Sequence, residues 1–131
     1  MIVADANLIA YYYFPGPMQP AARKVLEKDP SWYVPPIMIS EFRNITLGFI
    51  RAKKLKLRDA IDLMTRVEMV FASRTRGVSS MTVVELAVYS GCSAYDTEYV
   101  VLAQMLGVPL VTQDKQLIKT FPNVACSLDN F

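Results

Sequence analysis

Two short apolar runs constrain the fold most strongly: Ile2–Ala4 near the start of the chain and Val108–Thr112 near its end. Each has the length and composition of a buried strand, and an aspartate follows each within two residues. Between them, apolar residues recur at helical spacing, most clearly from about Arg58 to Phe71. Short apolar strands that alternate with helices indicate an α/β layer fold with a central, mainly parallel sheet.

The other elements are predicted from the same pattern and from proline and glycine signals. A helix should begin directly after Asp5, and Gly91 and Gly107 are suited to end two later helices. The expected helices cover residues 19–28, 36–51, 58–71, 83–89 and 94–107, and the remaining strands cover residues 32–34 and 124–126. A chain of 131 residues with 53% apolar side chains has the size of one domain, which we expect to span residues 1–131.

Composition narrows the class of protein. A formal net charge of +2 is too small to argue for nucleic-acid binding by itself. The two cysteines, Cys92 and Cys126, lack any paired metal-binding spacing and are interpreted as reduced thiols. No basic stretch precedes the N-terminal apolar run, and Gly107 and Pro109 break the uncharged stretch at 99–113. We therefore expect a cytoplasmic protein without a membrane span.

Four acidic residues lie against apolar segments instead of on polar faces: Asp5, Glu41, Asp96 and Asp114. Asp5 and Asp114 each follow a strand of the predicted parallel sheet, so both should leave from the same edge, where sites form in such folds. Asp96 should lie in the first turn of a helix. The helical stripe that carries Glu41, which we expect to be mostly buried, comprises Ile37, Glu41, Asn44, Ile45 and Gly48.

A cation would explain this placement. Like charges about 4 Å apart repel by roughly 1 to 4 kcal/mol per pair. The chain has no histidine, and an all-oxygen ligand set favours Mg²⁺ or Mn²⁺ over zinc. Each residue alone also has a simpler interpretation: Asp5 or Asn7 as a helix cap, Asp96 as a cap in competition with Ser93, and Asp114 as part of an exposed turn.

Four segments carry a resemblance to a known family. They are Ile2-Val3-Ala4-Asp5-Ala6-Asn7, Ser40-Glu41 followed by Asn44, Tyr95-Asp96 with Tyr99 and Ala103, and Leu110-Val111-Thr112-Gln113-Asp114-Lys115. In this order and separation the chain resembles the PIN-domain ribonucleases, most closely the small VapC-type toxins of toxin–antitoxin pairs. The resemblance covers nearly the whole chain and implies a PIN-like three-layer α/β/α sandwich.

The resemblance also implies an activity: a metal-dependent endoribonuclease that acts as the toxin of a toxin–antitoxin system. Its expected partners are an RNA substrate, a cognate antitoxin and a second copy of the chain. The implied ligands of one or two Mg²⁺ or Mn²⁺ ions are Asp5, Glu41, Asp96 and Asp114, supported by Asn7 and Thr112. Two positions depart from the family pattern, because Ala6 replaces a hydroxyl residue and Glu98 stands where a small residue is usual.

Metal-assisted attack of water on a phosphodiester requires no histidine or activated serine. We expect Asp5 and Asp96 to be the principal ligands. The candidate RNA-binding residues are Arg51, Lys53, Lys54, Arg74 and Arg76, although such a charge run is equally typical of a solvated helix end. The aromatic run Tyr11–Phe14 is expected to pack in the core, with a contact to an antitoxin or a second copy as the other interpretation.

Two other functions stay open at this point. A catalytically silent PIN-like module would bind RNA or a protein without cutting, and the presence of all four acids argues against it. A phosphoacceptor or phosphatase usually has paired acids after the first strand, whereas Ala6 and Asn7 follow Asp5 here.

Overall fold

The computed structural model describes residues 1–131 and is built on a four-stranded sheet in the order β2-β1-β3-β4. All neighbouring strands are parallel, and Val3 in the central strand pairs with Tyr33 on one side and with Leu110 on the other. The strands are β1 (Ile2–Ala4), β2 (Trp32–Tyr33), β3 (Leu110–Val111) and β4 (Ala125–Cys126). The predicted parallel sheet is confirmed.

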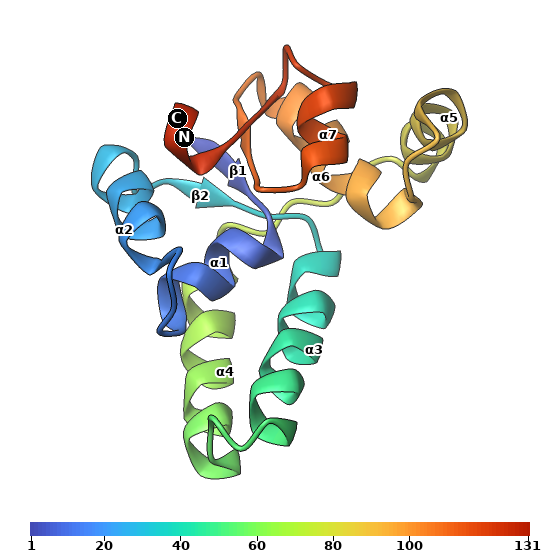
Figure 1. The fold of residues 1–131 in the computed structure, drawn as a ribbon. Helices are drawn as coiled ribbons and strands as arrows, with labels where there is room; N and C mark the ends of the chain where they lie inside the picture. Colours follow the sequence, from blue (N-terminus) through green and yellow to red (C-terminus); the bar gives the residue numbers. More distant parts are fainter.

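Helices cover both faces of this sheet, so the predicted α/β/α sandwich is also confirmed (Figure 1). Helix α6 packs on β1 and β3, whereas α1 packs against α2 and α3. Helices α3 and α4 run side by side away from the sheet, and α5 projects on the far side of α6 (Figure 1). The helices are α1 (Ala6–Tyr13), α2 (Gln19–Lys28), α3 (Ile37–Arg51), α4 (Leu57–Phe71), α5 (Ser80–Ser90), α6 (Ala94–Leu106) and α7 (Lys115–Thr120), followed by a 3₁₀ turn, Leu128–Asn130.

The core explains why the strands show no alternation of apolar and polar residues. Every residue of β1 and β3 is fully buried, as expected for a sheet covered by helices on both faces. Large side chains from both helical layers fill the interior, including Leu8 of α1, Phe42 of α3 and Leu102 of α6. Burying a side chain of this size contributes about 1.5 to 3 kcal/mol. This packing fixes the position of the carboxyl ends of β1 and β3, which Asp5 and Asp114 follow.

Two helices differ from the sequence expectation. Helix α5 begins at Ser80, three residues earlier than expected, because the Ser79 hydroxyl accepts a hydrogen bond from the Thr82 backbone N–H. Helix α7 was absent from the expected elements, and it begins where the Asp114 carboxylate accepts the first backbone N–H groups.

The glycine signals were correct. Gly91 and Gly107 end α5 and α6 with positive φ angles of 73° and 66°, a conformation that glycine adopts without strain. None of the helices combines the length and apolar character needed to cross a membrane.

Candidate metal site at the sheet edge

One cavity of about 480 Å³ brings all four acidic residues together. It opens where β1 and β3 end, between the N-termini of α1, α6 and α7 and one side of α3. No basic side chain lines it. The lining residues are Asp5, Ala6, Asn7, Ile37, Ser40, Glu41, Asn44, Ile45, Tyr95, Asp96, Tyr99, Asp114 and Leu117. We call this the acidic cavity.

Asp5 is the most deeply buried of the four acids, with 6% of its surface exposed. Its Oδ1 accepts a hydrogen bond from the Leu8 backbone N–H at 2.6 Å, and its Oδ2 accepts one from the Thr112 hydroxyl. Burial raises the pKa of Asp5 to about 6, although these two hydrogen bonds oppose the shift. Asp5 therefore caps α1, as the simpler interpretation held, while it also lines the acidic cavity.

Thr112 connects the two acids at the sheet edge. Its fully buried hydroxyl donates to Asp5 and accepts a hydrogen bond from the Asp114 backbone N–H at 2.9 Å. Asp114 in turn uses Oδ1 to accept the Gln116 and Leu117 N–H groups at 2.8 and 3.0 Å, which caps α7. The second oxygen of Asp114 makes no hydrogen bond within the protein, so it is available to a ligand.

Asp96 lies in the first turn of α6 and is half-buried. The cap of this helix is Ser93, the competing residue, whose hydroxyl accepts the Asp96 backbone N–H at 3.0 Å. The same hydroxyl donates to Asp96 Oδ2 at 2.8 Å. The Asp96 side chain is thus not needed as a cap, and its Oδ1 makes no hydrogen bond within the protein.

Glu41 receives a hydrogen bond from the hydroxyl of Tyr99, a residue of α6 that is only 2% exposed. Burial raises the pKa of Glu41, and the carboxylates of Asp96 and Glu98 raise it further, whereas the hydrogen bond from Tyr99 lowers it. Burial and the same hydrogen bond raise the pKa of Tyr99, so its hydroxyl remains a donor at neutral pH. This role of Tyr99 was not predicted from the sequence. Its position three residues after Asp96, on the same helical face, was the available signal.

The expectation that the Glu41 stripe is mostly buried is wrong. The buried residues of α3 are Met38, Phe42 and Thr46, one position further along. Glu41 itself is half-buried, and Asn44 on its stripe is exposed. The reason is that α3 packs on the core through the face that carries Met38, Phe42 and Thr46. The adjacent Glu41 stripe therefore borders the acidic cavity.

Two further residues lie at or near this site. Asn7 is exposed and lines the acidic cavity, but it does not cap α1. Glu98 is half-buried and does not line the cavity, yet its charge reaches Glu41. Burial raises the pKa of Glu98, and a hydrogen bond from the Ile37 backbone opposes that shift.

The donor chemistry of the acidic cavity fits Mg²⁺ or Mn²⁺, because it offers carboxylate oxygens and no competing basic group. Asp5 also feels the repulsion of Glu41 and Asp114, which a cation would relieve. No group of three or more acidic side chains is placed to hold one ion together. Mg²⁺ commonly binds through one or two carboxylates and retains several waters, so the arrangement suits a partly hydrated ion.

The candidate RNA-binding residues lie in two separate places. Arg51, Lys53 and Lys54 are exposed at the end of α3 and in the turn to α4. Arg74 donates to the Pro30 carbonyl, and Arg76 donates to the backbone of its own turn and lies over the Tyr33 ring. None of the five lines the acidic cavity, but Lys54 borders a groove of about 270 Å³ that shares Asn7 and Ile45 with it.

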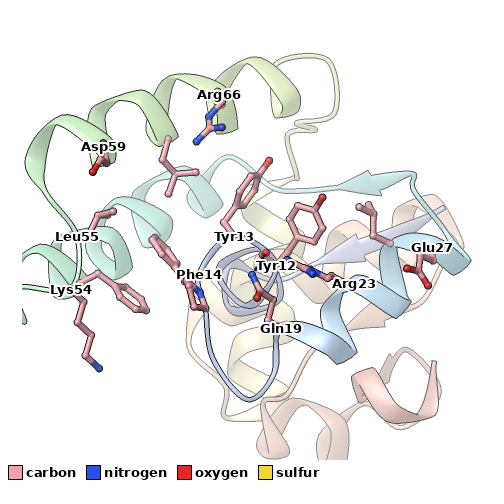
Figure 2. A pocket seen from close by; sticks show the side chains of 14 residues that line it. Tyr12, Tyr13, Phe14, Gln19, Arg23, Glu27, Lys54, Leu55, Asp59 and Arg66 are labelled. Carbon is pink, nitrogen blue, oxygen red and sulfur yellow. Dashed lines mark hydrogen bonds between the residues drawn. The ribbon is translucent and has the colours of Figure 1, made fainter.

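The aromatic run is only partly in the core. Phe14 is buried, whereas Tyr11, Tyr12 and Tyr13 are half-buried. A cavity of about 800 Å³ between α1, α2 and α4 exposes the side chains of Tyr12 and Tyr13, with Arg23 and Arg66 near them (Figure 2). We call it the aromatic cavity. The expectation of core packing is therefore correct for Phe14 and incomplete for the tyrosines.

Comparison with known proteins places the chain in a family. Residues 2–121 match the PIN domain, so the chain belongs to the PIN-domain family. It is 26% identical over 124 residues to the ribonuclease VapC3 of Pyrobaculum aerophilum, a match that covers 92% of this chain and 95% of that protein.

Solved structures share the fold. The crystal structure of PAE2754 from Pyrobaculum aerophilum superimposes with a TM-score of 0.74 at 21% identity, over 98% of this chain and 84% of that one. A chain of a toxin–antitoxin complex from Klebsiella pneumoniae superimposes with a TM-score of 0.67 at 15% identity, over 98% of both chains.

Proposed function

We propose that the protein is a metal-dependent endoribonuclease that hydrolyses RNA phosphodiester bonds and acts as the toxin of a toxin–antitoxin pair. The observation that carries this proposal is the acidic cavity, which is lined by four carboxylates from distant parts of the chain and by no basic side chain. Membership of the PIN-domain family and similarity to a ribonuclease support RNA as the substrate. Residues 1–131 would act as one domain, and an RNA substrate would place the protein in the cytoplasm.

In this proposal Asp5 and Asp96 are the principal ligands of one or two Mg²⁺ or Mn²⁺ ions, and Asp114 and Glu41 complete the set directly or through water. When bound, such ions supply an activated water and stabilise the leaving oxygen. The protein contributes the orientation of its ligands. Thr112 and the Leu8 backbone hold Asp5 in place, and Ser93 holds Asp96. Asn7 stands at the rim, where its amide can reach the substrate.

The RNA would enter along the groove that joins the acidic cavity to Lys54. Lys54 lines this groove, and Arg51 and Lys53 are exposed close to it in the sequence. None of the three forms an ion pair, so they can bind phosphates of the strand. Arg74 and Arg76 already contact the protein backbone, and we assign them a smaller share of the binding.

For the antitoxin we propose the aromatic cavity as the docking site. Tyr12 and Tyr13 present half-buried rings for apolar side chains of the partner (Figure 2). Arg23 and Arg66 offer sites for its acidic side chains, and Glu27 and Asp59 in the same lining offer sites for basic ones. The fold neighbour from Klebsiella pneumoniae belongs to a toxin–antitoxin complex, which supports a protein partner of this kind.

For the homodimer we propose the outer face of α5. Its Met81, Val84, Val88 and Tyr89 are between 57% and 88% exposed, an unusual concentration of apolar surface on one helix. A second copy would cover this face. Val88→Lys should then yield a monomer in light scattering, while an unchanged dimer would place the contact elsewhere.

The test of the activity is cleavage of single-stranded RNA by the purified protein with Mn²⁺ or Mg²⁺, compared with the same reaction in EDTA. Asp5→Asn and Asp96→Asn serve as the matched variants, because each removes a charge without changing the size of the side chain. Cleavage should require the metal and both aspartates. Cleavage that survives chelation would contradict the proposal, and RNA binding without any cleavage would favour the catalytically silent module.

A further inference from the structure

The site contains a hydroxyl whose placement the proposed ligands do not explain. Tyr99 lies one turn after Asp96 on α6, so its ring is carried on the same face as that acid. The ring is almost completely buried, yet the hydroxyl reaches the acidic cavity and donates to Glu41, 58 residues earlier in the chain. A buried tyrosine needs a partner for its hydroxyl, and here the partner is an acid of the site.

Glu41 has fewer hydrogen-bond donors than the two acids at the sheet edge, and, unlike the single donor of Asp96, its donor comes from another helix. Asp5 has two donors, and Asp114 is held by two backbone N–H groups. Tyr99 is the one protein donor that Glu41 has, and no basic residue lines the cavity. The side chain of Glu41 is long and half-exposed, and it faces the repulsion of Asp96. Without the Tyr99 hydroxyl, the Glu41 side chain would favour rotamers that point into solvent.

We propose that Tyr99 is a positioning residue that holds the Glu41 carboxylate inside the acidic cavity, so that it can take part in binding a divalent cation. This inference rests on the proposed function in that it assumes a cation in the cavity. The proposed role belongs to the Tyr99 hydroxyl and not to its ring, because a phenylalanine at this position would fill the same space in the core. Removing a residue that orients a metal ligand typically lowers metal affinity or activity on the order of 10- to 100-fold.

The experiment compares Mn²⁺ affinity, measured by calorimetry on the protein without RNA, in wild type, Tyr99→Phe, Glu41→Gln and the double variant. Tyr33→Phe, which removes a hydroxyl that makes no hydrogen bond and lies outside the cavity, is the control. Tyr99→Phe should lose on the order of 10- to 100-fold in affinity. The double variant should lose no more than Glu41→Gln alone, because Tyr99 acts through Glu41.

Three results separate the possible failures. Wild-type Mn²⁺ affinity in Tyr99→Phe, or losses that add in the double variant, would overturn the positioning role while leaving the ribonuclease proposal intact. Non-additive losses without RNA cleavage would support Tyr99 and contradict the ribonuclease. Should Tyr99→Phe melt well below wild type, Glu41→Asp gives a second test. This variant shortens the acid beyond reach of the hydroxyl and should lower Mn²⁺ affinity at least as much as Tyr99→Phe. Wild-type affinity in Glu41→Asp would overturn the positioning role.

Discussion

The two acids at the sheet edge are held differently from the two acids on the helices. Asp5 and Asp114 follow buried strands, and backbone N–H groups together with the hydroxyl of Thr112 fix their carboxylates. Glu41 and Asp96 are half-buried and receive one side-chain hydroxyl each. Backbone donors thus fix the acids at the sheet edge and side-chain hydroxyls fix those on the helices, and of the four only Asp5 is fully buried.

This difference has an electrostatic consequence. Burial raises the pKa of Asp5 to about 6, so the metal-free protein must keep a desolvated charge at neutral pH. No comparable burial applies to Asp96, which is open to water on one side. Removing the charge should therefore raise the stability of the metal-free protein at Asp5 and have a much smaller effect at Asp96.

The largest effect on stability is expected for Asp5→Asn in the metal-free protein. A shift from 3.8 to about 6, at about 1.4 kcal/mol per pKa unit, is worth about 3 kcal/mol. Because the folded pKa is raised, ionised Asp5 costs stability above pH 6, and the cost vanishes below about pH 4. Denaturant unfolding across this pH range should show Asp5→Asn more stable at pH 8 and equal to wild type at pH 3.5. A destabilised variant at pH 8 would show that the charge is compensated in the folded protein.

Thr112→Val should have the next largest effect. It removes the hydroxyl that donates to Asp5 and accepts from the Asp114 backbone, leaving buried groups without partners. We expect a loss of about 1 to 3 kcal/mol in the free energy of unfolding. Thr112→Ser retains the hydroxyl and serves as its control in the same unfolding assay. Equal losses in both variants would mean that the methyl group, and not the hydrogen bonds, is responsible.

Asp96→Asn should change stability far less than Asp5→Asn, although both should remove activity. The carboxylate is half-buried, and at the start of α6 it gains only about 0.3 to 1 kcal/mol from the helix. Thermal unfolding should detect a small destabilisation. A stabilisation as large as that expected for Asp5→Asn would contradict the difference in burial between Asp5 and Asp96.

The smallest effect is expected outside the cavity, at Lys54. An exposed phosphate contact contributes up to about 1 kcal/mol, so Lys54→Ala should raise the KM for RNA by up to about fivefold without changing kcat. The dependence of binding on salt should also weaken. Lys24→Ala, on the exposed side of α2, is the charge-matched control. A change in kcat at Lys54 would mean that it acts on the chemistry instead of on binding.

Much of this architecture was predictable from local signals. The fully apolar run Ile2–Ala4 became the central strand, and Gly91 and Gly107 ended their helices as predicted. The α7 helix was missed because its first turn depends on Asp114, which the sequence presents equally well as a turn residue. Local sequence patterns therefore predict the type and approximate position of a helix or strand better than the side-chain contacts that begin or end it.

The site was harder to predict in detail. Parallel strands place Asp5 and Asp114 at one edge of the sheet, and the direct pairing of β1 with β3, which the sequence did not predict, brings them close together. The angle at which α3 packs is set by tertiary contacts of Met38 and Phe42, and periodicity could not show that the Glu41 stripe would border a cavity instead of the core. The partnership of Tyr99 with Glu41 has the same origin, since the two residues meet only after folding.

The proposal on which the site depends is that the acidic cavity binds a divalent cation. It is tested most directly by anomalous diffraction from crystals of the protein soaked in Mn²⁺. We expect an anomalous peak in the acidic cavity, within ligating distance of Asp5 and Asp96 and absent from Asp5→Asn crystals. An empty cavity at saturating Mn²⁺, or a peak bound elsewhere on the surface, would contradict it.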